Sequence, residues 1–145
     1  MTNLVLGWQF WAFLAAVFAA LTAIFVKAGV DDINPDLATL LRTIVVVIAL
    51  GALVWATGRL EDLSEIKLRT LFFLVMSGLA TGASWLCYFR AMQLGDASRV
   101  APVDKLSVVF VAVIAALFLG EKLSIFGWCG VGLIAVGAII LALAP

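Results

Sequence analysis

The sequence predicts an all-α integral membrane protein with five transmembrane helices, and three observations support this fold class. The 145-residue chain is 66% hydrophobic and 12% charged, whereas an ordinary soluble domain carries about 25% charged residues. Its long charge-free stretches approach or exceed the roughly 20 residues that a helix needs to cross a bilayer. These stretches lack the polar alternation of barrel strands, and irregular backbone cannot face lipid.

Five apolar stretches predict the helices in order. The charge-free runs are 4–26, 43–58, 70–89, 106–120 and 123–145. The first, third and fifth can span a bilayer unaided, whereas the second must recruit Arg42 and the fourth must recruit Asp104 and Lys105. We expect one transmembrane domain over residues 1–145, with helices at about 5–27, 36–57, 68–94, 99–119 and 124–144. The first run is too long for a typical signal peptide and lacks a basic start, so we expect it in the mature protein.

Capping residues predict where several helices begin. Asn34 followed by Pro35 is a typical helix start, because the asparagine side chain accepts backbone N–H bonds and proline needs no donor there. Ser98 is expected to cap the fourth helix, with Pro102 in its first turn, and Ser124 is expected to cap the fifth. The charged segment from 58 to 69 is expected to be the main solvated loop, in which a short interfacial helix can follow Ser64.

Lysine and arginine residues are almost evenly divided between the two membrane sides. With five alternating spans, the side of the N-terminus holds Arg59, Lys67, Arg69 and Lys122, and the other side holds Lys27, Arg42, Arg90, Arg99 and Lys105. Because the excess of these residues sets orientation, so small a difference allows insertion either way. The alternative is that one charged loop dominates and fixes the topology.

The third helix carries a row of hydroxyl groups. Ser77, Thr81, Ser84 and Tyr88 follow helical spacing and share one face. Beside this row, Gly78, Gly82 and Trp85 form a second stripe, whose glycines allow close helix approach. The row is expected to wall a wetted cavity, with Trp85 stacking on the solute or gating it. Alternatively, each hydroxyl bonds back to the carbonyl one turn earlier.

Charged residues inside the expected membrane spans are the most costly ones, at about 2.5–3.5 kcal/mol each near the membrane centre and less near the interface. Arg42 and the Asp104–Lys105 pair approach from the same membrane face, and with Arg90 they are expected to line a vestibule that attracts a carboxylate or phosphate. Asp104 can alternatively exchange a proton during the cycle. In the competing interpretation, Asp104 complements a helix N-terminus while Arg42 and Lys105 snorkel to the headgroups.

Other function classes receive little support. The chain has no histidine, which removes the commonest general base and metal ligand. We expect no catalytic residue, metal or cofactor, although a lipid enzyme using Asp104 and Lys105 is an alternative. No block of lysine and arginine indicates nucleic-acid binding. The expected partners are a small-molecule solute and the lipid bilayer.

Several short motifs together resemble the EamA-type drug/metabolite transporter superfamily, in its small five-helix form. They are Asn34-Pro35 with Arg42, Ser84-Trp85, Tyr88-Phe89-Arg90-Ala91, Ala101-Pro102, Leu119-Gly120-Glu121 and the glycines Gly127, Gly130 and Gly137. The resemblance covers essentially the whole chain. It implies a multi-pass protein of the cytoplasmic membrane that transports small metabolites, amino acids, organic anions or drugs. Longer members of the family commonly have uncharged residues at the positions of Asp104 and Lys105, so their substrates are not assigned to this chain.

Longer members of this family fuse two such units as an inverted repeat. One unit has an odd number of helices, so two identical copies would form that repeat only as an antiparallel dimer. We therefore expect one half of a transporter: a homodimer of dual topology that works by alternating access. Its contact is expected at Gly127, Gly130 and Gly137. The alternative is a non-transporting assembly or regulatory subunit.

Overall fold

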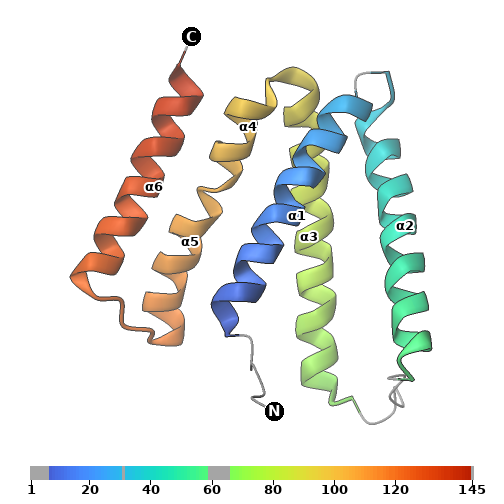
Figure 1. Ribbon diagram of the computed structural model, residues 1–145. Coiled ribbons are helices and arrows are strands. Elements are labelled where there is room, and N and C mark those ends of the chain that lie inside the picture. The colour runs from blue at the N-terminus through green and yellow to red at the C-terminus, as the bar shows by residue number, and fades with distance from the viewer. Residues whose placement is uncertain (1–6, 31, 59–65, 145) are drawn as a thin grey trace, which may run out of the picture. The chain divides into compact units, whose positions relative to one another are not determined.

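The computed structural model describes residues 7–30, 32–58 and 66–144, and these residues form helices without any strand. Five segments are long and apolar enough to cross a membrane, namely Trp8–Gly29, Pro35–Ala56, Leu68–Leu94, Ala97–Leu119 and Ile125–Leu143 (Figure 1). The predicted all-α fold with five membrane-spanning helices is therefore confirmed. The expected start of the first helix at residue 5 and the interfacial helix after Ser64 lie outside the described residues.

Two of the predicted helix caps are present. Helix α2 spans Pro35–Ala56, and the Oδ1 atom of Asn34 accepts bonds from the N–H groups of Asp36 at 2.8 Å and Leu37 at 3.3 Å. Helix α6 spans Ile125–Leu143, and Ser124 Oγ accepts a bond from the N–H of Gly127 at 3.2 Å. Both side chains satisfy N–H groups that have no partner within the helix.

The predicted cap at Ser98 is wrong. Helix α4 spans Ala97–Asp104, so Ser98 lies inside its first turn and Asp96 precedes it. The carbonyl of Asp96 already accepts bonds from the N–H groups of Arg99 at 3.0 Å and Val100 at 2.9 Å. The helical bonds therefore begin at Asp96. Pro102 consequently lies in the second turn of α4 rather than in the first.

The fourth span is interrupted instead of forming one continuous α-helix. It consists of α4, α5 (Ser107–Ile114) and a π-helical turn η2 (Ala115–Leu119). At the junction of α4 and α5 the backbone hydrogen bonds join residues three apart instead of four. The N–H of Lys105 donates to the carbonyl of Pro102 at 3.1 Å, and the N–H of Leu106 donates to the carbonyl of Val103 at 3.0 Å. This tighter 3₁₀-type pattern is typical of short connecting turns. The span ends at Gly120, whose φ of +69° is a conformation that glycine adopts readily.

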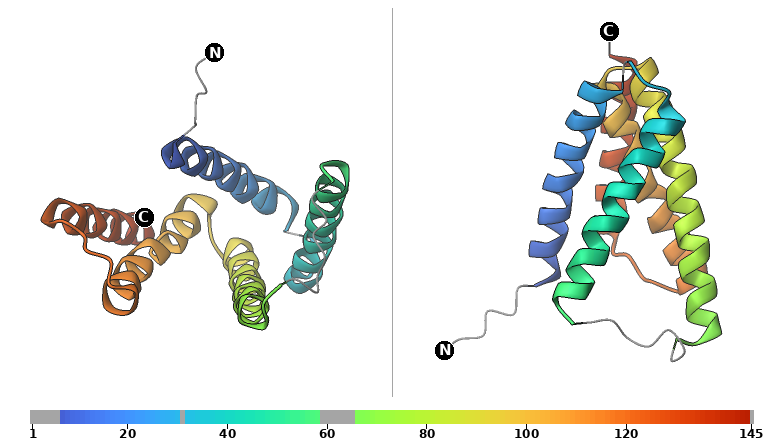
Figure 2. Two further views of the ribbon diagram at one scale, coloured as in Figure 1. Left: turned by 90° about the horizontal axis from the view of Figure 1, so that it is seen from below. Right: turned by 90° about the vertical axis from the view of Figure 1, so that its right-hand side faces the viewer.

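The structure divides into two parts, each described by itself. One part, residues 30–93, holds α2 and most of α3 (Leu68–Leu94); we call it the α2–α3 part. The other, residues 1–29 and 94–145, holds α1 (Trp8–Gly29), α4, α5, η2 and α6. In this second part α6 packs beside α4 and α5, and α1 contacts α4 (Figures 1 and 2).

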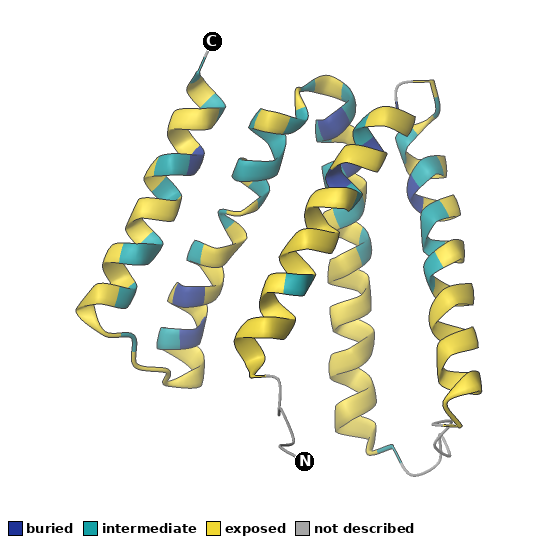
Figure 3. Cartoon of the chain, viewed as in Figure 1, coloured by how far each residue is buried: buried dark blue, intermediate teal, exposed yellow. Residues whose placement is uncertain are grey.

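Most residues of the described helices are exposed (Figure 3), and many of the exposed residues are large and apolar. Phe18, Leu79 and Phe118 are 59%, 65% and 81% exposed, respectively, although each lies within a spanning segment. Exposed apolar surface on this scale is costly in water. The same surface is well matched to hydrocarbon, so the burial pattern agrees with a membrane protein.

Candidate functional site

Arg42 and Trp85 form a cation–π contact between α2 and α3. The guanidinium carbon of Arg42 lies 4.1 Å from the centroid of the Trp85 ring and 5.7 Å from the centroid of Phe89. Tyr88, which follows Trp85 by three residues on α3, is half-buried. A cation over an aromatic face is attracted to the ring, most strongly for tryptophan. The predicted site residues Arg42 and Trp85 are therefore brought together.

Sequence spacing places these side chains on facing surfaces. On α2, the better-covered positions Pro35, Thr39, Arg42 and Val46 recur every three or four residues. On α3, the positions Gly82, Trp85, Phe89 and Met92 do the same. Such spacing aligns residues along one face of a helix. The stripe that contains Trp85, rather than Ser77, Thr81 and Ser84 of the neighbouring hydroxyl row, therefore faces Arg42.

No carboxylate among the described residues pairs with Arg42; its contacts are aromatic. Arginine carries five N–H donors in one plane and stays charged in proteins. Aromatic contact with the flat face of the guanidinium does not use up the donors along its edge. Arg42 can therefore offer a two-pronged hydrogen-bonding edge to a carboxylate or a phosphate.

Arg90 is bound to Asp36, a neighbour that the sequence pattern does not single out. Its Nη2 atom donates to Asp36 Oδ1 at 3.2 Å and to Oδ2 at 3.0 Å. The pair joins the first turn of α2 to the last part of α3, although the residues are 54 positions apart in sequence. No local spacing predicts such a contact.

Gln93 fixes the loop that leads into α2. Its side-chain amide donates to the carbonyl oxygens of Val30 at 3.1 Å and Ile33 at 3.0 Å. Carbonyl groups that turn away from water need donors of this kind. Together with the Asp36–Arg90 pair, Gln93 holds one end of α2 against the end of α3. Gln93 was not predicted; a single amide near the end of an apolar helix is the signal that could have found it.

The hydroxyl row of α3 is placed differently from its neighbouring stripe. Ser77, Thr81 and Ser84 are exposed on the described chain. Thr81 Oγ1 donates to the carbonyl of Ser77 at 2.9 Å, which is the backbone-directed alternative for a membrane helix. The structure therefore does not bring these three hydroxyls into the Arg42–Trp85 contact. Their role in solute binding stays a prediction.

Asp104 and Lys105 belong to the other part of the chain. Lys105 Nζ donates to Asp104 Oδ2 at 3.0 Å, so these adjacent residues form an ion pair at the interruption between α4 and α5. The expected common vestibule with Arg42 and Arg90 stays a prediction. Breaks in membrane helices commonly border binding sites in transporters, which keeps this pair of interest.

The three glycines expected at the subunit contact lie on α6 and differ in how much space surrounds them. A side-chain carbon added at Gly127 would meet Leu123 at 3.3 Å. At Gly130 and Gly137, by contrast, an added carbon would meet nothing within 4 Å. The latter two positions therefore have room for a neighbour that the single chain does not supply.

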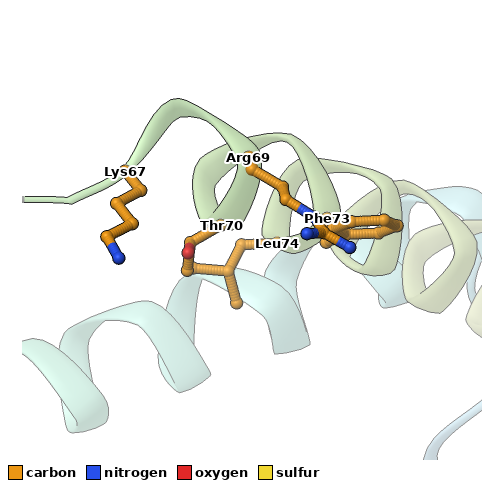
Figure 4. A pocket seen from close by; sticks show the side chains of 5 residues that line it. All are labelled: Lys67, Arg69, Thr70, Phe73 and Leu74. Carbon is orange, nitrogen blue, oxygen red and sulfur yellow. The ribbon is translucent and has the colours of Figure 1, made fainter.

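An open hollow lies at the start of α3, at the opposite end of this helix from Arg90. It has a volume of about 540 Å³ and is lined by Lys67, Arg69, Thr70, Phe73 and Leu74 (Figure 4). Arg69 lies over Phe73, with its guanidinium carbon 5.9 Å from the ring centroid. This is a weaker version of the Arg42 contact, because the distance is longer and the ring is phenylalanine.

Comparison with known proteins decides the family. The chain matches the EamA-like transporter family over residues 6–143. The chain belongs to this family. It is therefore a multi-pass membrane protein of the EamA-like transporter family, as the sequence motifs predicted. No solved structure matches the chain.

Two relatives of this EamA-like protein carry descriptive names. A Sinorhizobium protein named "Uncharacterized transporter in cobO 3'region" is 61% identical over 136 residues, which cover 94% of this chain and 96% of the relative. A protein of Aeromonas hydrophila named "Probable 4-amino-4-deoxy-L-arabinose-phosphoundecaprenol flippase subunit ArnE" is 36% identical over 75 residues, which cover 52% of this chain and 65% of that protein. Both names describe transport or flipping rather than catalysis.

Proposed function

We propose that this EamA-like protein moves small organic anions, amino-acid carboxylates among them, across the cytoplasmic membrane by alternating access. The observation that carries the proposal is the Arg42–Trp85 contact. It places a permanent positive charge in an apolar span, holds it on an aromatic ring, and leaves it without a carboxylate partner among the described residues.

The energetics favour an anionic solute. A single arginine near the middle of a bilayer costs about 2.5–3.5 kcal/mol by insertion measurements. A carboxylate bound to Arg42 neutralises that charge and uses the paired N–H donors of its edge. Trp85 and Phe89 add an apolar aromatic surface next to the charge. The site therefore suits a solute that carries a carboxylate on an apolar or aromatic body.

The other predicted residues are given supporting roles in this proposal. Tyr88 would hydrogen-bond a solute held by Arg42, since it lies three residues beyond Trp85 on α3. Ser77, Thr81 and Ser84 would line the path of the solute. Arg90, Asp104 and Lys105 would act at its entrance and at the break in the fourth span.

Counterflow in proteoliposomes tests transport. Vesicles containing purified protein are loaded with unlabelled benzenesulfonate, and the uptake of labelled benzenesulfonate is followed. This aromatic monoanion stays ionised and crosses lipid poorly, whereas benzoate crosses lipid as its neutral acid. Uptake should exceed that of protein-free vesicles and fall to that background in Arg42→Gln. Arg69→Gln is the matched control, because it removes an arginine that also lies over an aromatic ring. Equal losses in both variants would contradict a specific role for Arg42.

The contribution of Lys105 has a test of its own. Lys105→Ala should reduce counterflow while the protein keeps its elution volume in detergent. Unchanged counterflow would remove Lys105 from the solute path.

We further propose that the working unit is an antiparallel homodimer. Five spans place the two ends of a chain on opposite membrane sides, so an inverted repeat requires two oppositely oriented copies. The nearly equal positive charge of the two sides supports dual insertion. A relative with the word transporter in its name has almost the same length, since the match covers 96% of it. Gly130 and Gly137 have space for close contact with the second copy.

Reporter fusions to the C-terminus test this arrangement. Dual topology predicts that a cytoplasmic reporter and a periplasmic reporter are both active in cells that make the protein at native level. Activity of one reporter alone would contradict it.

A second candidate function is that of a membrane subunit without transport activity of its own. The relative named as a flippase subunit supports this alternative. Affinity purification from native membranes separates the two possibilities. A different membrane protein recovered at fixed stoichiometry would favour the subunit role, whereas recovery of the tagged and untagged forms of this chain together would favour the homodimer.

A further inference from the structure

The Asp36–Arg90 pair sets the charge next to Arg42. Both carboxylate oxygens of Asp36 accept bonds from Arg90, at 3.2 and 3.0 Å. The two side chains are 50% and 63% exposed, respectively, so they lie at an accessible end of the α2–α3 part. Their formal charges cancel, and the donors of Arg90 that face Asp36 are occupied.

Arg42 lies six residues beyond Asp36 on α2, which corresponds to about 9 Å along the helix axis. The described helices α2 and α3 contain four charged residues, namely Asp36, Arg42, Arg69 and Arg90. Arg69 is 21 residues from Arg90 on α3, or about 32 Å along its axis. At the end of the α2–α3 part that holds the Arg42–Trp85 contact, the described residues also include Asp32, an exposed carboxylate just before α2. Arg42 is therefore the one described positive charge at this end that has no carboxylate partner, because Arg90 is paired with Asp36.

We infer that Asp36, by occupying Arg90, restricts the site to solutes with a single negative charge. The inference rests on the proposed function, in which Arg42 binds the solute anion. A monoanion on Arg42 gives a neutral complex, which is cheaper to hold in an apolar span than a charged one. The second carboxylate of a dianion would meet the negative charge of Asp36 and an arginine that is already paired. Asp36 and Arg90 are thus specificity-determining residues, although neither needs to touch a monoanion.

Benzoate and terephthalate are suitable probes, because they share one ring and carry one and two carboxylates. Equilibrium dialysis of the full-length protein in lipid nanodiscs measures the affinity for each. The wild-type protein should bind benzoate at least about tenfold more tightly than terephthalate, since one well-placed charged hydrogen bond contributes roughly a factor of ten.

Two variants test the cause of this preference. Asp36→Asn removes the negative charge and frees Arg90, so the affinity ratio should shift about tenfold toward terephthalate. The double variant Asp36→Asn/Arg90→Gln lacks both charges and should again prefer benzoate. Both variants lack the ion pair between α2 and α3. A difference in affinity ratio between them therefore reports the charge of Arg90 and not the loss of this contact.

The outcomes separate this inference from the proposed function. If Arg42→Gln loses benzoate binding but Asp36→Asn leaves the affinity ratio unchanged, the charge restriction is wrong and the Arg42 site stands. A wild-type preference for terephthalate would also overturn the restriction alone. If Arg42→Gln binds benzoate as tightly as the wild type, or if the wild type binds neither probe, the proposed site itself is wrong and the inference falls with it.

Discussion

The guanidinium carbon of Arg42 lies 4.1 Å from the centroid of the Trp85 ring, and this contact connects α2 to α3. The ring covers one face of the charged group, while Phe89 lies 5.7 Å away. Exposed cation–π contacts contribute about 0.5–1 kcal/mol, and desolvated ones about 2 kcal/mol or more. The contact therefore offsets part of the cost of placing arginine in an apolar span and fixes where its hydrogen-bonding edge lies.

Arg42→Lys should not preserve function. Lysine keeps the charge but has a compact ammonium group, without the planar edge that pairs with a carboxylate or the flat face that stacks on Trp85. We expect the affinity for benzoate to fall about tenfold, corresponding to about 1.4 kcal/mol. Equilibrium dialysis measures the change, and wild-type affinity in Arg42→Lys would show that charge alone matters.

Substitutions of Trp85 should have graded effects. Trp85→Phe keeps an aromatic face with a weaker attraction for cations, so benzoate affinity should drop by about two- to fivefold. Trp85→Leu removes the aromatic face and should have a larger effect. The same affinity in both variants would mean that the ring acts only by its volume.

Gln93→Leu should destabilise the fold without changing charge. The substitution leaves the carbonyl groups of Val30 and Ile33 without their donor, which costs about 1–3 kcal/mol for a group shielded from water. Thermal unfolding in detergent measures the loss. Gln9→Leu is the matched control, because Gln9 is an exposed glutamine near the start of α1 and should change stability by less than about 0.5 kcal/mol. Equal unfolding temperatures for the two variants would contradict the role given to Gln93.

Gly120→Ala should destabilise the protein by about 1–2 kcal/mol, because Gly120 has a φ of +69° that alanine adopts only with strain. Gly132→Ala is the contrasting variant. Gly132 lies within α6 with open space around the position of an added carbon, and alanine is the better helix former. Gly132→Ala should therefore be neutral or stabilising in the same unfolding assay. Equal destabilisation of both would argue against the backbone explanation.

The helices could be predicted because their signals are local. The apolar runs, the cap at Asn34 and the cap at Ser124 depend on residues within one or two turns. The start of α4 was predicted wrongly because a local signal can also mislead. A serine before an apolar helix is a typical cap, yet the carbonyl of Asp96 begins the helical bonds two residues earlier.

The site was only partly predictable, because its contacts join distant segments. Arg42 and Trp85 stood out as unusual residues in apolar spans, and the structure places them in contact. The partner of Arg90 was missed, since nothing near Arg90 in sequence points to Asp36. The interruption at Lys105 and Leu106 was also missed, because Pro102 lies one turn before it and the apolar pattern continues past it.

The most direct measurement of the central claim is the quenching of Trp85 fluorescence by an aromatic anion that contains a heavy atom. A variant that keeps Trp85 as its single tryptophan is made by replacing the other four, Trp8, Trp11, Trp55 and Trp128, with phenylalanine. If Arg42 binds the carboxylate beside Trp85, 4-iodobenzoate should quench the emission in a saturable manner, and Arg42→Gln in the same background should abolish the saturable component. The neutral analogue 4-iodobenzamide controls for partition into lipid. Saturable quenching of the same affinity in Arg42→Gln, or equal quenching by both compounds, would contradict an anion site at Arg42 and Trp85.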